Sequence, residues 1–398
     1  MNFITLDSFS VENKKVLIRV DFNVPMKDGK VVGLERILRA APTIIELIEK
    51  GAKIIVLSHL GRPEGTGFEA EFSLKPIAQA LSEVLKKPVA FASDCIGDVA
   101  KTAISKMQKG DVLMLENVRF YKAESKNDIE FTKKLAELGE LYVSDAFSAS
   151  HRAHSSTEGL AHLLPYAAGR LMEAELKALE LALGNPQKPL GALVGGAKIS
   201  TKLGVFHNLV KKANVLIVGG GMANTFLYSQ GVDIGKSLAE KDMKDECIAI
   251  IKEAKANNCQ IMLPVDARVS KEIKGTPVQI IQHGSLPEGF EVFDIGTQTI
   301  MNYSEAIREL KTLVWNGPVG AFEFEPFFTG TYELAKVAAS QTKAGKLVTI
   351  AGGGDTVSAL QNAGVYNDFT YISTAGGAFL EWMEGKVLPG VECLRKKK

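Results

Sequence analysis

The sequence predicts an α/β protein built from two doubly wound parallel sheets, each with helices on both faces. The first observation is a regular alternation of apolar, β-branched runs with helical patterns, which is typical of such sheets. The second is that many of these apolar runs end in glycine-rich sequence. The third is the length of 398 residues, which exceeds one ordinary hydrophobic core and makes two domains the expectation.

Composition and charge are those of a globular enzyme and exclude several other classes of protein. Hydrophobic residues make up 46% of the chain and charged residues 23%, which is ordinary for a globular fold. The 47 Lys and Arg residues balance the 46 Asp and Glu residues, so we expect neither nucleic acid nor a membrane as a partner. The spacing of the four cysteines is not that of metal ligands or of a disulfide-rich protein. The sequence shows no signal peptide and no apolar run of about 20 residues. These features predict a reduced, cytoplasmic setting.

Five apolar runs in the first half of the chain have the composition of buried strands. They cover residues 16–22, 53–58, 89–93, 112–116 and 141–146. Helical patterns separate them, for example over 38–50, 76–85 and 129–138. Because strands joined by crossover helices run parallel, this half is predicted to form one sheet of its own.

A long helical pattern divides the two halves. Residues 171–183, LMEAELKALELAL, are strong helix formers without glycine, and Gly-Asn-Pro at 184–186 ends the pattern. The strand–helix rhythm restarts at Leu190. We therefore predict two Rossmann-like domains over 1–170 and 186–385, joined by a helix over 171–185. The alternative is one more crossover helix within a single large sheet.

Glycine-rich turns follow the strand candidates of the second half. Residues 346–360, KLVTIAGGGDTVSAL, pass from a buried strand through three glycines into a helix, and such a helix N-terminus holds phosphate. Asp355 fits beside phosphate if Mg²⁺ lies between them, whereas the alternative is a tight turn with Asp355 as a helix cap. Similar turns end the runs at 190–198, 213–222, 312–320 and 369–377. Their number indicates one nucleotide-sized site at the carboxyl ends of the strands.

Basic side chains follow the strands of the first half. Asp21 and Asn23 come directly after the first strand, and five basic residues follow this strand and later ones: Arg36, His59, Arg62, Arg119 and Arg152. A lone arginine after a strand is more often a surface residue, but so many positive charges repel one another unless an anion is present. Because arginine holds carboxylate or phosphate through paired N–H groups, we expect an anion site at this edge of the sheet.

Two lysines follow the glycines at 195–196. Lys198 and Lys202 are four residues apart, so on a helix they would share one face and point at phosphates held by the glycine turns. The alternative is a pair of solvated helix lysines. The second half contains neither a Walker A motif nor G-x-G-x-x-G, which argues against a nicotinamide-dependent dehydrogenase.

The sequence resembles the phosphoglycerate kinase family over essentially its whole length. The motifs that carry the resemblance are RVDFNVP (19–25), SHLGRP (58–63), LENVRF (115–120), HRAH (151–154), GGAK (195–198), VWNGP (314–318), GGGDT (352–356) and STAGG (373–377). The resemblance implies a monomeric, two-domain enzyme with an interdomain cleft and a hinge. It implies phosphoryl transfer from 1,3-bisphosphoglycerate to ADP, which gives 3-phosphoglycerate and ATP in glycolysis, with Mg²⁺.

The resemblance also implies a role for individual residues. The triose-phosphate contacts fall on Asp21, Asn23, Arg36, His59, Arg62, Arg119 and Arg152. The nucleotide contacts fall on Lys202, Gly219, Gly220, Gly296, Pro318, Glu323, Gly353, Gly354, Asp355 and Thr356, with Asp355 also at the Mg²⁺. The groups that stabilise the moving phosphoryl group fall on Arg36, Lys198, Gly354 and Gly377.

Two loops depart from the family's pattern. Ala375 stands where the family usually has the first of three glycines, and Ser148-Ala149-Ser150 replaces a turn that usually contains glycine. The resemblance further implies that the tail 386–398 folds back on the first domain. A catalytically silent adenine-nucleotide-binding protein of the same fold is the alternative to an enzyme.

Overall fold

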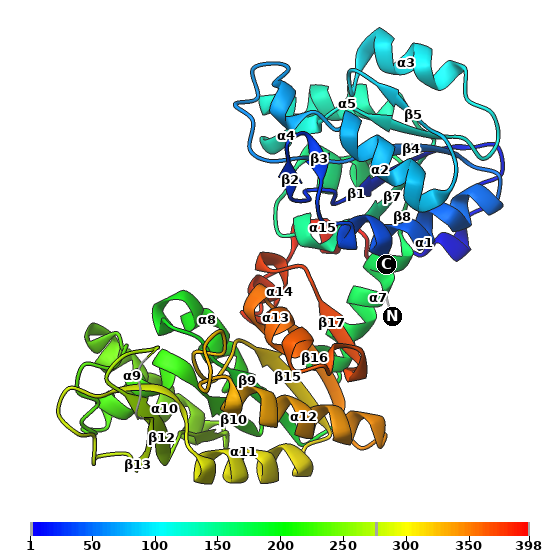
Figure 1. Cartoon of the computed structure of the whole chain (residues 1–398). Coiled ribbons are helices and arrows are strands. Elements are labelled where there is room, and N and C mark those ends of the chain that lie inside the picture. Colours follow the sequence, from blue (N-terminus) through cyan, green and yellow to red (C-terminus); the bar gives the residue numbers. More distant parts are fainter. Residues whose placement is uncertain (1–2, 275–277, 397–398) are drawn as a thin grey trace. The chain divides into compact units, whose positions relative to one another are not determined.

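The computed structural model describes residues 3–274 and 278–396 and separates into two compact units (Figure 1). The first unit comprises Met1–Lys177 and Val387–Lys398, and the second comprises Ala178–Lys386. The boundary falls within helix α7 (Arg170–Leu179), which continues as a π-helical turn over Glu180–Gly184. The helix expected over 171–185 is therefore α-helical only to Leu179. The wider turn is closed by Asn185 N–H, which donates to the Glu180 carbonyl, five residues back.

The first unit is built on a six-stranded parallel sheet in the order β5-β6-β4-β1-β7-β8. Its strands are β1 (Lys15–Val20), β4 (Lys53–Leu57), β5 (Val89–Ala92), β6 (Val112–Leu115), β7 (Leu141–Asp145) and β8 (Tyr166–Ala168). A short antiparallel hairpin, β2 (Met26–Lys27) and β3 (Lys30–Val31), follows β1. The central position of β1 explains why five of its six residues are buried.

Helices cover both faces of this sheet. They are α1 (Glu35–Glu49), α2 (Lys75–Leu85), α3 (Gly97–Ser105), α4 (Lys122–Ser125), α5 (Ile129–Ala136) and α6 (Leu160–Leu163). Alternate residues of β1 point to opposite faces, so Val16, Ile18 and Val20 join the core under α1 and α2. The side chain of Leu17 packs on the other face, against Gly139 after α5.

The C-terminal segment packs on the first unit. Helix α15 (Pro389–Glu392) lies against the turn before His151, where Gly390 N–H donates to the Ser150 carbonyl at 2.9 Å. Beyond it, the Tyr166 hydroxyl donates to the Arg395 carbonyl at 2.9 Å, and Ile4 N–H donates to the Leu394 carbonyl at 3.3 Å. The last two residues of the predicted tail lie outside the described residues.

The second unit is built on another six-stranded parallel sheet, in the order β11-β10-β9-β15-β16-β17. Its strands are β9 (Leu190–Val194), β10 (Val215–Val218), β11 (Gln260–Met262), β15 (Thr312–Asn316), β16 (Val348–Gly352) and β17 (Tyr371–Ser373). Its helices are α8 (Leu203–Leu209), α9 (Gly220–Ser229), α10 (Lys244–Ala256), α11 (Thr297–Glu309), α12 (Thr329–Lys343), α13 (Gly354–Asn362) and α14 (Gly377–Met383). Two separate parallel sheets confirm the predicted α/β class and exclude the single large sheet.

A smaller antiparallel sheet also belongs to the second unit and was not predicted. It contains β12 (Asp266–Ser270), β13 (Gln279–Gln282) and β14 (Glu291–Ile295), in the order β13-β12-β14. Ala267, Val269 and Phe290 form a small core of its own. Among the described residues, none of the helices combines the length and apolar character needed to cross a bilayer.

Candidate active site

Asp21 is the centre of a polar cluster at the carboxyl end of β1. Its carboxylate accepts hydrogen bonds from the Arg36 guanidinium at the start of α1 and from the Ser148 hydroxyl after β7. Asn23 N–H donates to Asp21 Oδ1 at 3.0 Å, and Gly61 N–H after β4 donates to Asn23 Oδ1 at 2.9 Å. Segments that follow three neighbouring strands are thus joined at one edge of the sheet.

His59 lies in this cluster as a neutral imidazole. Arg19 Nη2 is 3.0 Å from His59 Nδ1, and a guanidinium can only donate, so Nδ1 is the acceptor and Nε2 carries the proton. Burial lowers the pKa of His59 well below its ordinary value, and the positive charge of Arg19 adds to the effect. The 4.0 Å approach of Nδ1 to the Asp21 carboxylate is therefore not an ion pair.

The Asp21 carboxylate remains ionised in this setting. Burial opposes its charge, but the adjacent Arg36 guanidinium and the Ser148 hydroxyl outweigh burial and lower its pKa. Arg36 itself stays about one-third exposed, so its guanidinium faces both the carboxylate and solvent. Arg36 can therefore bind an anion while the Asp21 carboxylate holds the guanidinium in a fixed orientation.

Two more arginines follow β4 and β6, the next two strands of the sheet on one side of β1. Arg119, after β6, donates through Nη1 to the Gly61 carbonyl at 2.9 Å. Its pKa is lowered by burial and by the nearby charges of Arg19 and Arg62, which places these three guanidinium groups close together. Arg62 lies in the loop after β4 and is exposed.

The loop after β7 brings a fourth arginine to this edge. Arg152 is exposed, and its neighbour His154 is half-buried. Burial, together with the charges of Arg119, Arg19 and Arg152, lowers the pKa of His154 to about 4. The seven residues predicted for this site therefore all follow strands at one edge of one sheet. Hydrogen bonds that run through Asp21 and Gly61 link four of them, namely Asp21, Asn23, Arg36 and Arg119.

Sequence reasoning missed the buried support beneath this cluster. Arg19 is only 1% exposed within β1 and donates through Nε to Ser156 Oγ at 2.8 Å. Ser156 Oγ in turn donates to the buried carboxylate of Glu124 at 2.5 Å, and burial raises the pKa of that carboxyl. A charged residue inside an apolar strand run was the available signal, but its partners are more than a hundred residues away.

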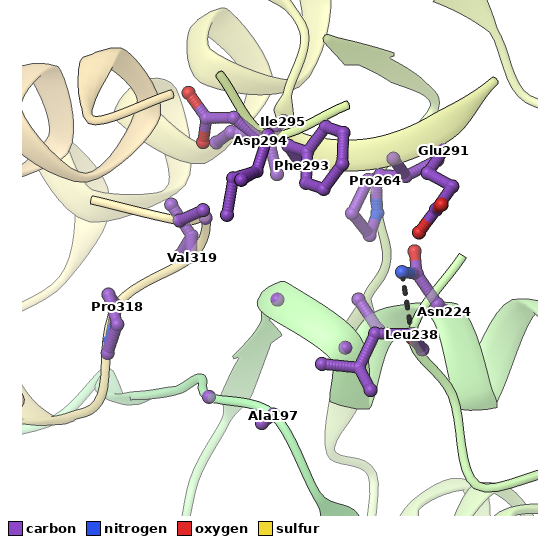
Figure 2. A pocket seen from close by; sticks show the side chains of 18 of the residues that line it. Ala197, Asn224, Leu238, Pro264, Glu291, Phe293, Asp294, Ile295, Pro318 and Val319 are labelled. Atoms are coloured by element: carbon purple, nitrogen blue, oxygen red, sulfur yellow. Dashed lines mark hydrogen bonds between the residues drawn. The ribbon is translucent and has the colours of Figure 1, made fainter. Parts of the chain in front are cut away.

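The second unit contains a cavity of about 260 Å³ among its glycine-rich loops (Figure 2). The lining includes Gly220, Pro318, Glu323 and Asp355 of the predicted nucleotide residues. Hydrogen bonds between loops hold this wall together: Gly220 N–H donates to the Val319 carbonyl at 2.9 Å and Met222 N–H to the Gly196 carbonyl at 3.1 Å. Apolar side chains of Leu238, Pro264, Phe293 and Val319 line much of the rest.

The two lysines do not share a helical face, so that expectation was wrong. Lys198 is extended and exposed, and a 3-10 turn over Ile199–Lys202 separates it from α8. Lys202 is instead drawn inward, where its ammonium group donates to the carbonyls of Gly195 at 2.8 Å and Asn316 at 3.3 Å. Burial lowers the pKa of Lys202 to about 8, against the attraction of Asp355.

The turn before α13 has the form expected of a phosphate loop. Gly353, with φ of +100°, precedes the helix, and Asn316 Nδ2 donates to the Gly352 carbonyl at 2.7 Å. Asp355 is exposed in the first turn of α13, after the cap position, so the helix-cap alternative is wrong. The hydroxyl of Thr356 accepts from Gly317 N–H at 2.7 Å and is part of the loop's own structure.

Five predicted glycines are not part of the cavity lining, namely Gly219, Gly296, Gly353, Gly354 and Gly377. Gly219 packs against Val319 just before α9, and Gly377 begins α14. Gly296 precedes α11, whose first N–H groups are taken by the Asp266 carboxylate, with Thr299 N–H donating at 2.8 Å. Asp294 and Ile295, directly before Gly296, line the cavity, so Gly296 follows the lining in the chain.

Comparison with known proteins places this arrangement in a family. A family model described as Phosphoglycerate kinase matches residues 6–386. A relative from Bradyrhizobium diazoefficiens named phosphoglycerate kinase is 57% identical over 396 residues, with 99% of each chain covered. The chain belongs to the phosphoglycerate kinase family. A phosphoglycerate kinase from Mesorhizobium japonicum is 58% identical at the same coverage, which again confirms the resemblance found in the motifs.

Solved phosphoglycerate kinase structures share the fold. The structure from Coxiella burnetii is similar with a TM-score of 0.92 at 43% identity, covering 98% of each chain. The structure from Pyrococcus horikoshii is similar with a TM-score of 0.77 at 32% identity and the same coverage.

The two departures from the phosphoglycerate kinase pattern are both accommodated. In the STAGG loop the left-handed backbone falls at Gly376, with φ of +53°, and Ala375 is not among the described residues with positive φ. An alanine therefore costs this turn no strain. In the other loop, Ser148 donates to the Asp21 carboxylate, so the serine adds a support to the polar cluster.

Proposed function

We propose that this chain catalyses reversible phosphoryl transfer from 1,3-bisphosphoglycerate to ADP, giving 3-phosphoglycerate and ATP. The proposal depends on one observation: a single chain of the phosphoglycerate kinase family contains two complementary sites. One is the cluster of basic residues around Asp21, and the other is the cavity among the glycine loops. A silent nucleotide-binding protein is not favoured, because nothing would then require so many arginines at the edge of the first sheet.

The chemistry requires alignment and positive charge rather than a general base. The acceptor carboxylate of 3-phosphoglycerate is already ionised at neutral pH, so no residue has to remove a proton from it. The neutral state of His59 and the raised pKa of buried Glu124 agree with supporting roles for these groups. What remains is to hold the reacting oxygens in line and to stabilise charge on the transferring group.

The residues divide by task in this proposal. Asp21, Asn23, His59, Arg62, Arg119 and Arg152 bind the triose phosphate, while Gly220, Pro318 and Glu323 hold the nucleoside with Lys202 and the 353–356 loop at its phosphates. Arg36, oriented by Asp21, and Lys198, which is exposed and free of the contacts that hold Lys202, stabilise the moving phosphoryl group. Backbone N–H groups of Gly354 and Gly377, at the starts of α13 and α14, complete that set.

Magnesium fits the residues at the edge of the cavity. Asp355 offers one exposed carboxylate in the cavity lining, and its attraction to Lys202 supports a role for both residues beside the nucleotide phosphates. Mg²⁺ in such a site would take most of its ligands from nucleotide phosphates and water. When bound, Mg²⁺ would neutralise phosphate charge in the transfer.

The proposed enzyme is a cytoplasmic monomer whose two units close around both ligands. Direct transfer needs the reacting atoms within about 3–3.5 Å of each other, and water must be excluded from the acyl phosphate. A ligand bound mainly to one unit cannot achieve this alone. Closure about the helix that joins the units would bring the two ligands together.

A coupled assay with purified protein, 3-phosphoglycerate, ATP and Mg²⁺ tests the function. We expect turnover that requires all three, with 1,3-bisphosphoglycerate detected by a linked reductive step. Protein that binds ATP but gives no turnover would establish the silent alternative. Quenching of intrinsic fluorescence by NAD but not by ATP would favour a dehydrogenase instead.

A further inference from the structure

We propose that the amino edge of the second sheet binds an extended acidic segment of a partner protein. This edge is formed by the loops that precede five neighbouring strands, and these loops cover residues 253–259, 209–214, 184–189, 308–311 and 343–347. The glycine loops of the cavity follow strands of the same sheet at their carboxyl ends, so the two edges are opposite one another. The inference therefore concerns a surface separate from the proposed active site.

Each of the five strands is preceded by one or two basic residues. All eight side chains are exposed, and together we call them the basic edge: Lys255 before β11, Lys211 and Lys212 before β10, Lys188 before β9, Arg308 and Lys311 before β15, and Lys343 and Lys346 before β16. Because these strands are neighbours in the sheet, the eight cations follow one line across it.

Backbone hydrogen bonds fix the loops of the basic edge in this line. Asn214 N–H, before β10, donates to the Leu190 carbonyl at 2.7 Å, and Lys311 N–H, before β15, donates to the Pro189 carbonyl at 2.9 Å. Val348 N–H donates to the Lys311 carbonyl at 2.9 Å. Neighbouring strands are about 4.8 Å apart, so the line spans about 19 Å, which is the length of about six residues of an extended chain.

Most of the positive charge on the basic edge is not neutralised within the chain. Lys211 pairs with Glu253 at 3.1 Å, and Lys343 pairs with Asp368 at 2.9 Å. Within residues 3–274 and 278–396, the other six cations of the basic edge have no ion pair. The loops contain only two acidic residues, Glu253 and Glu309, although the whole chain has a net charge of only +1. The excess of positive charge is therefore local, and it would attract a row of carboxylates.

The helix dipole explains only part of this row. Cations are favourable at the C-terminus of a helix, and Lys255, Arg308 and Lys343 lie in the last turns of α10, α11 and α12. Lys188 and Lys346 lie beyond the helices, in the loops themselves. A stabilising role at helix ends therefore does not account for them.

The amino edge of the first sheet lacks this character. Lysines also precede its strands, but they are interleaved with acidic residues, namely Glu12, Glu49, Asp111, Glu137 and Glu140. One of these carboxylates, that of Glu12, pairs with Lys109 at 2.7 Å. A row of unneutralised cations is thus particular to the second sheet and not a general consequence of the α/β fold.

The chemistry of the basic edge suits an acidic peptide better than a nucleic acid or a membrane. Seven of its eight cations are lysines, which lack the planar fork with which arginine binds phosphate. The aromatic side chains in the next loop along the edge, Tyr366 and Phe369, pack against the core of the second unit, so they do not offer their rings to bases. A bilayer is flat, whereas the edge of a sheet twists.

A fluorescein-labelled peptide of about twelve alternating Glu and Asp residues tests the proposal. Saturating 3-phosphoglycerate and MgADP occupy the other anion sites. We expect fluorescence anisotropy to show binding in about 50 mM NaCl that weakens by at least about tenfold in about 300 mM NaCl, because salt screens exposed charges. Absence of binding at the lower salt would overturn the proposal. Tighter binding of poly(U), or of vesicles containing phosphatidylserine, would overturn the choice of an acidic protein as partner.

A triple variant assigns the binding to the basic edge. Lys212→Gln, Lys311→Gln and Lys346→Gln together remove three exposed cations that have no ion pair in the described part of the chain. The affinity for the peptide should fall by at least roughly tenfold, the combined scale of three exposed charge pairs. Turnover in the coupled assay should equal that of the parent, because none of the three residues belongs to the proposed active site.

The matched control removes the same charge from the amino edge of the first sheet. Lys14→Gln, Lys86→Gln and Lys106→Gln replace three exposed lysines there and should change the affinity by less than about twofold. Equal losses in the two triple variants would overturn the proposal in favour of unspecific attraction. Carbodiimide cross-linking checks the unmodified protein: the peptide carboxylates should be joined mainly to lysines of the basic edge, and cross-links spread evenly over both units would contradict the assignment.

Discussion

The contact between Arg36 and Asp21 in the first unit offers the most direct test of the proposed function. Arg36 bonds the Asp21 carboxylate yet stays about one-third exposed, whereas Arg62 lies in a loop of its own after β4. Arg36 is thus oriented by a charged partner, whereas Arg62 is free to bind the phosphate of the triose. This difference in setting predicts a difference in kinetic role.

Replacing Arg36 and Arg62 with alanine should therefore change different parameters. We expect Arg36→Ala to lower kcat by about 10²-fold with little change in the KM for 3-phosphoglycerate, because its charge acts on the transferring group. Arg62→Ala should mainly raise that KM. Steady-state kinetics at saturating MgATP separate the two, and identical profiles would contradict the division of roles.

The carboxylate of Asp355 is expected to act through Mg²⁺. Asp355→Asn keeps the shape of the side chain but removes its charge, so it should weaken MgADP binding far more than binding of metal-free ADP. Titration calorimetry with and without EDTA measures both affinities. An equal loss for the two forms would show that the charge does not act through the metal.

The buried ammonium group of Lys202 predicts a pH dependence of nucleotide binding. With a pKa of about 8 in the free protein, Lys202 is mostly neutral at pH 9. Phosphates favour the charged form and would raise this pKa, so binding of ADP at pH 9 should take up a proton and affinity should fall as pH rises through 8.

Calorimetry in two buffers of different ionisation enthalpy counts that proton. ADP is fully ionised at pH 9, so uptake must occur on the protein. Lys202→Met should bind ADP more weakly and with no uptake. Unchanged uptake in this variant would assign the proton to another group.

Among the elements, the start of α13 shows how a loop is shaped to receive an anion. Gly353 has φ of +100°, and a Cβ atom there would lie 2.7 Å from Asn316 Nδ2, the group that holds the Gly352 carbonyl. A Cβ atom on the neighbouring Gly354, which begins the helix, would meet no heavy atom of another segment within 4 Å. The two glycines thus have different roles: Gly353 permits the turn, and Gly354 leaves space beside the N–H groups at the start of the helix.

Alanine at these two positions should separate stability from function. Gly353→Ala should destabilise the second unit by roughly 1–3 kcal/mol, because it combines a left-handed backbone with a close contact. Gly354→Ala should leave the thermal midpoint near that of the parent while reducing turnover by crowding the phosphate. Calorimetric melting and the coupled assay measure the two effects, and similar melting losses in both variants would contradict this reading of the turn.

For the whole molecule, the helix that joins the two units is the feature that bears on closure. Within the first unit, the opening turn of α7 is held firmly: Met172 N–H donates to the Asp145 carboxylate at 2.9 Å, and Arg170 pairs with Asp7 and Glu46. The π-helical turn Glu180–Gly184 begins in the second unit. We therefore place the proposed bend after the first turn of α7, toward residues 180–186.

Closure predicts a change in solution scattering. The radius of gyration should be smaller with 3-phosphoglycerate and a non-transferable ATP analogue together than with either ligand alone, because the bridging contacts need both. Each ligand alone is the control for local ordering. An unchanged radius in saturated, active protein would count against a hinge.

Local sequence determined much of this protein. The strand–helix rhythm established two parallel sheets, because alternation and crossover handedness leave few other arrangements. The residues at strand ends were also readable: Asp21, Arg36 and Arg119 meet because carboxyl ends of parallel strands share an edge. Motif resemblance identified the family, and the comparisons confirmed it.

Tertiary structure alone decided which side chains became supports and which face the ligands. Arg19 is buried because Ser156 and Glu124, far along the chain, receive it, and Lys202 turned inward because the carbonyls of Gly195 and Asn316 lie within its reach. The antiparallel sheet β13-β12-β14 was likewise not predicted, because its strands pair across loops of the second unit. Such partners are determined by packing between distant segments, so they cannot be predicted from the spacing of residues within one segment.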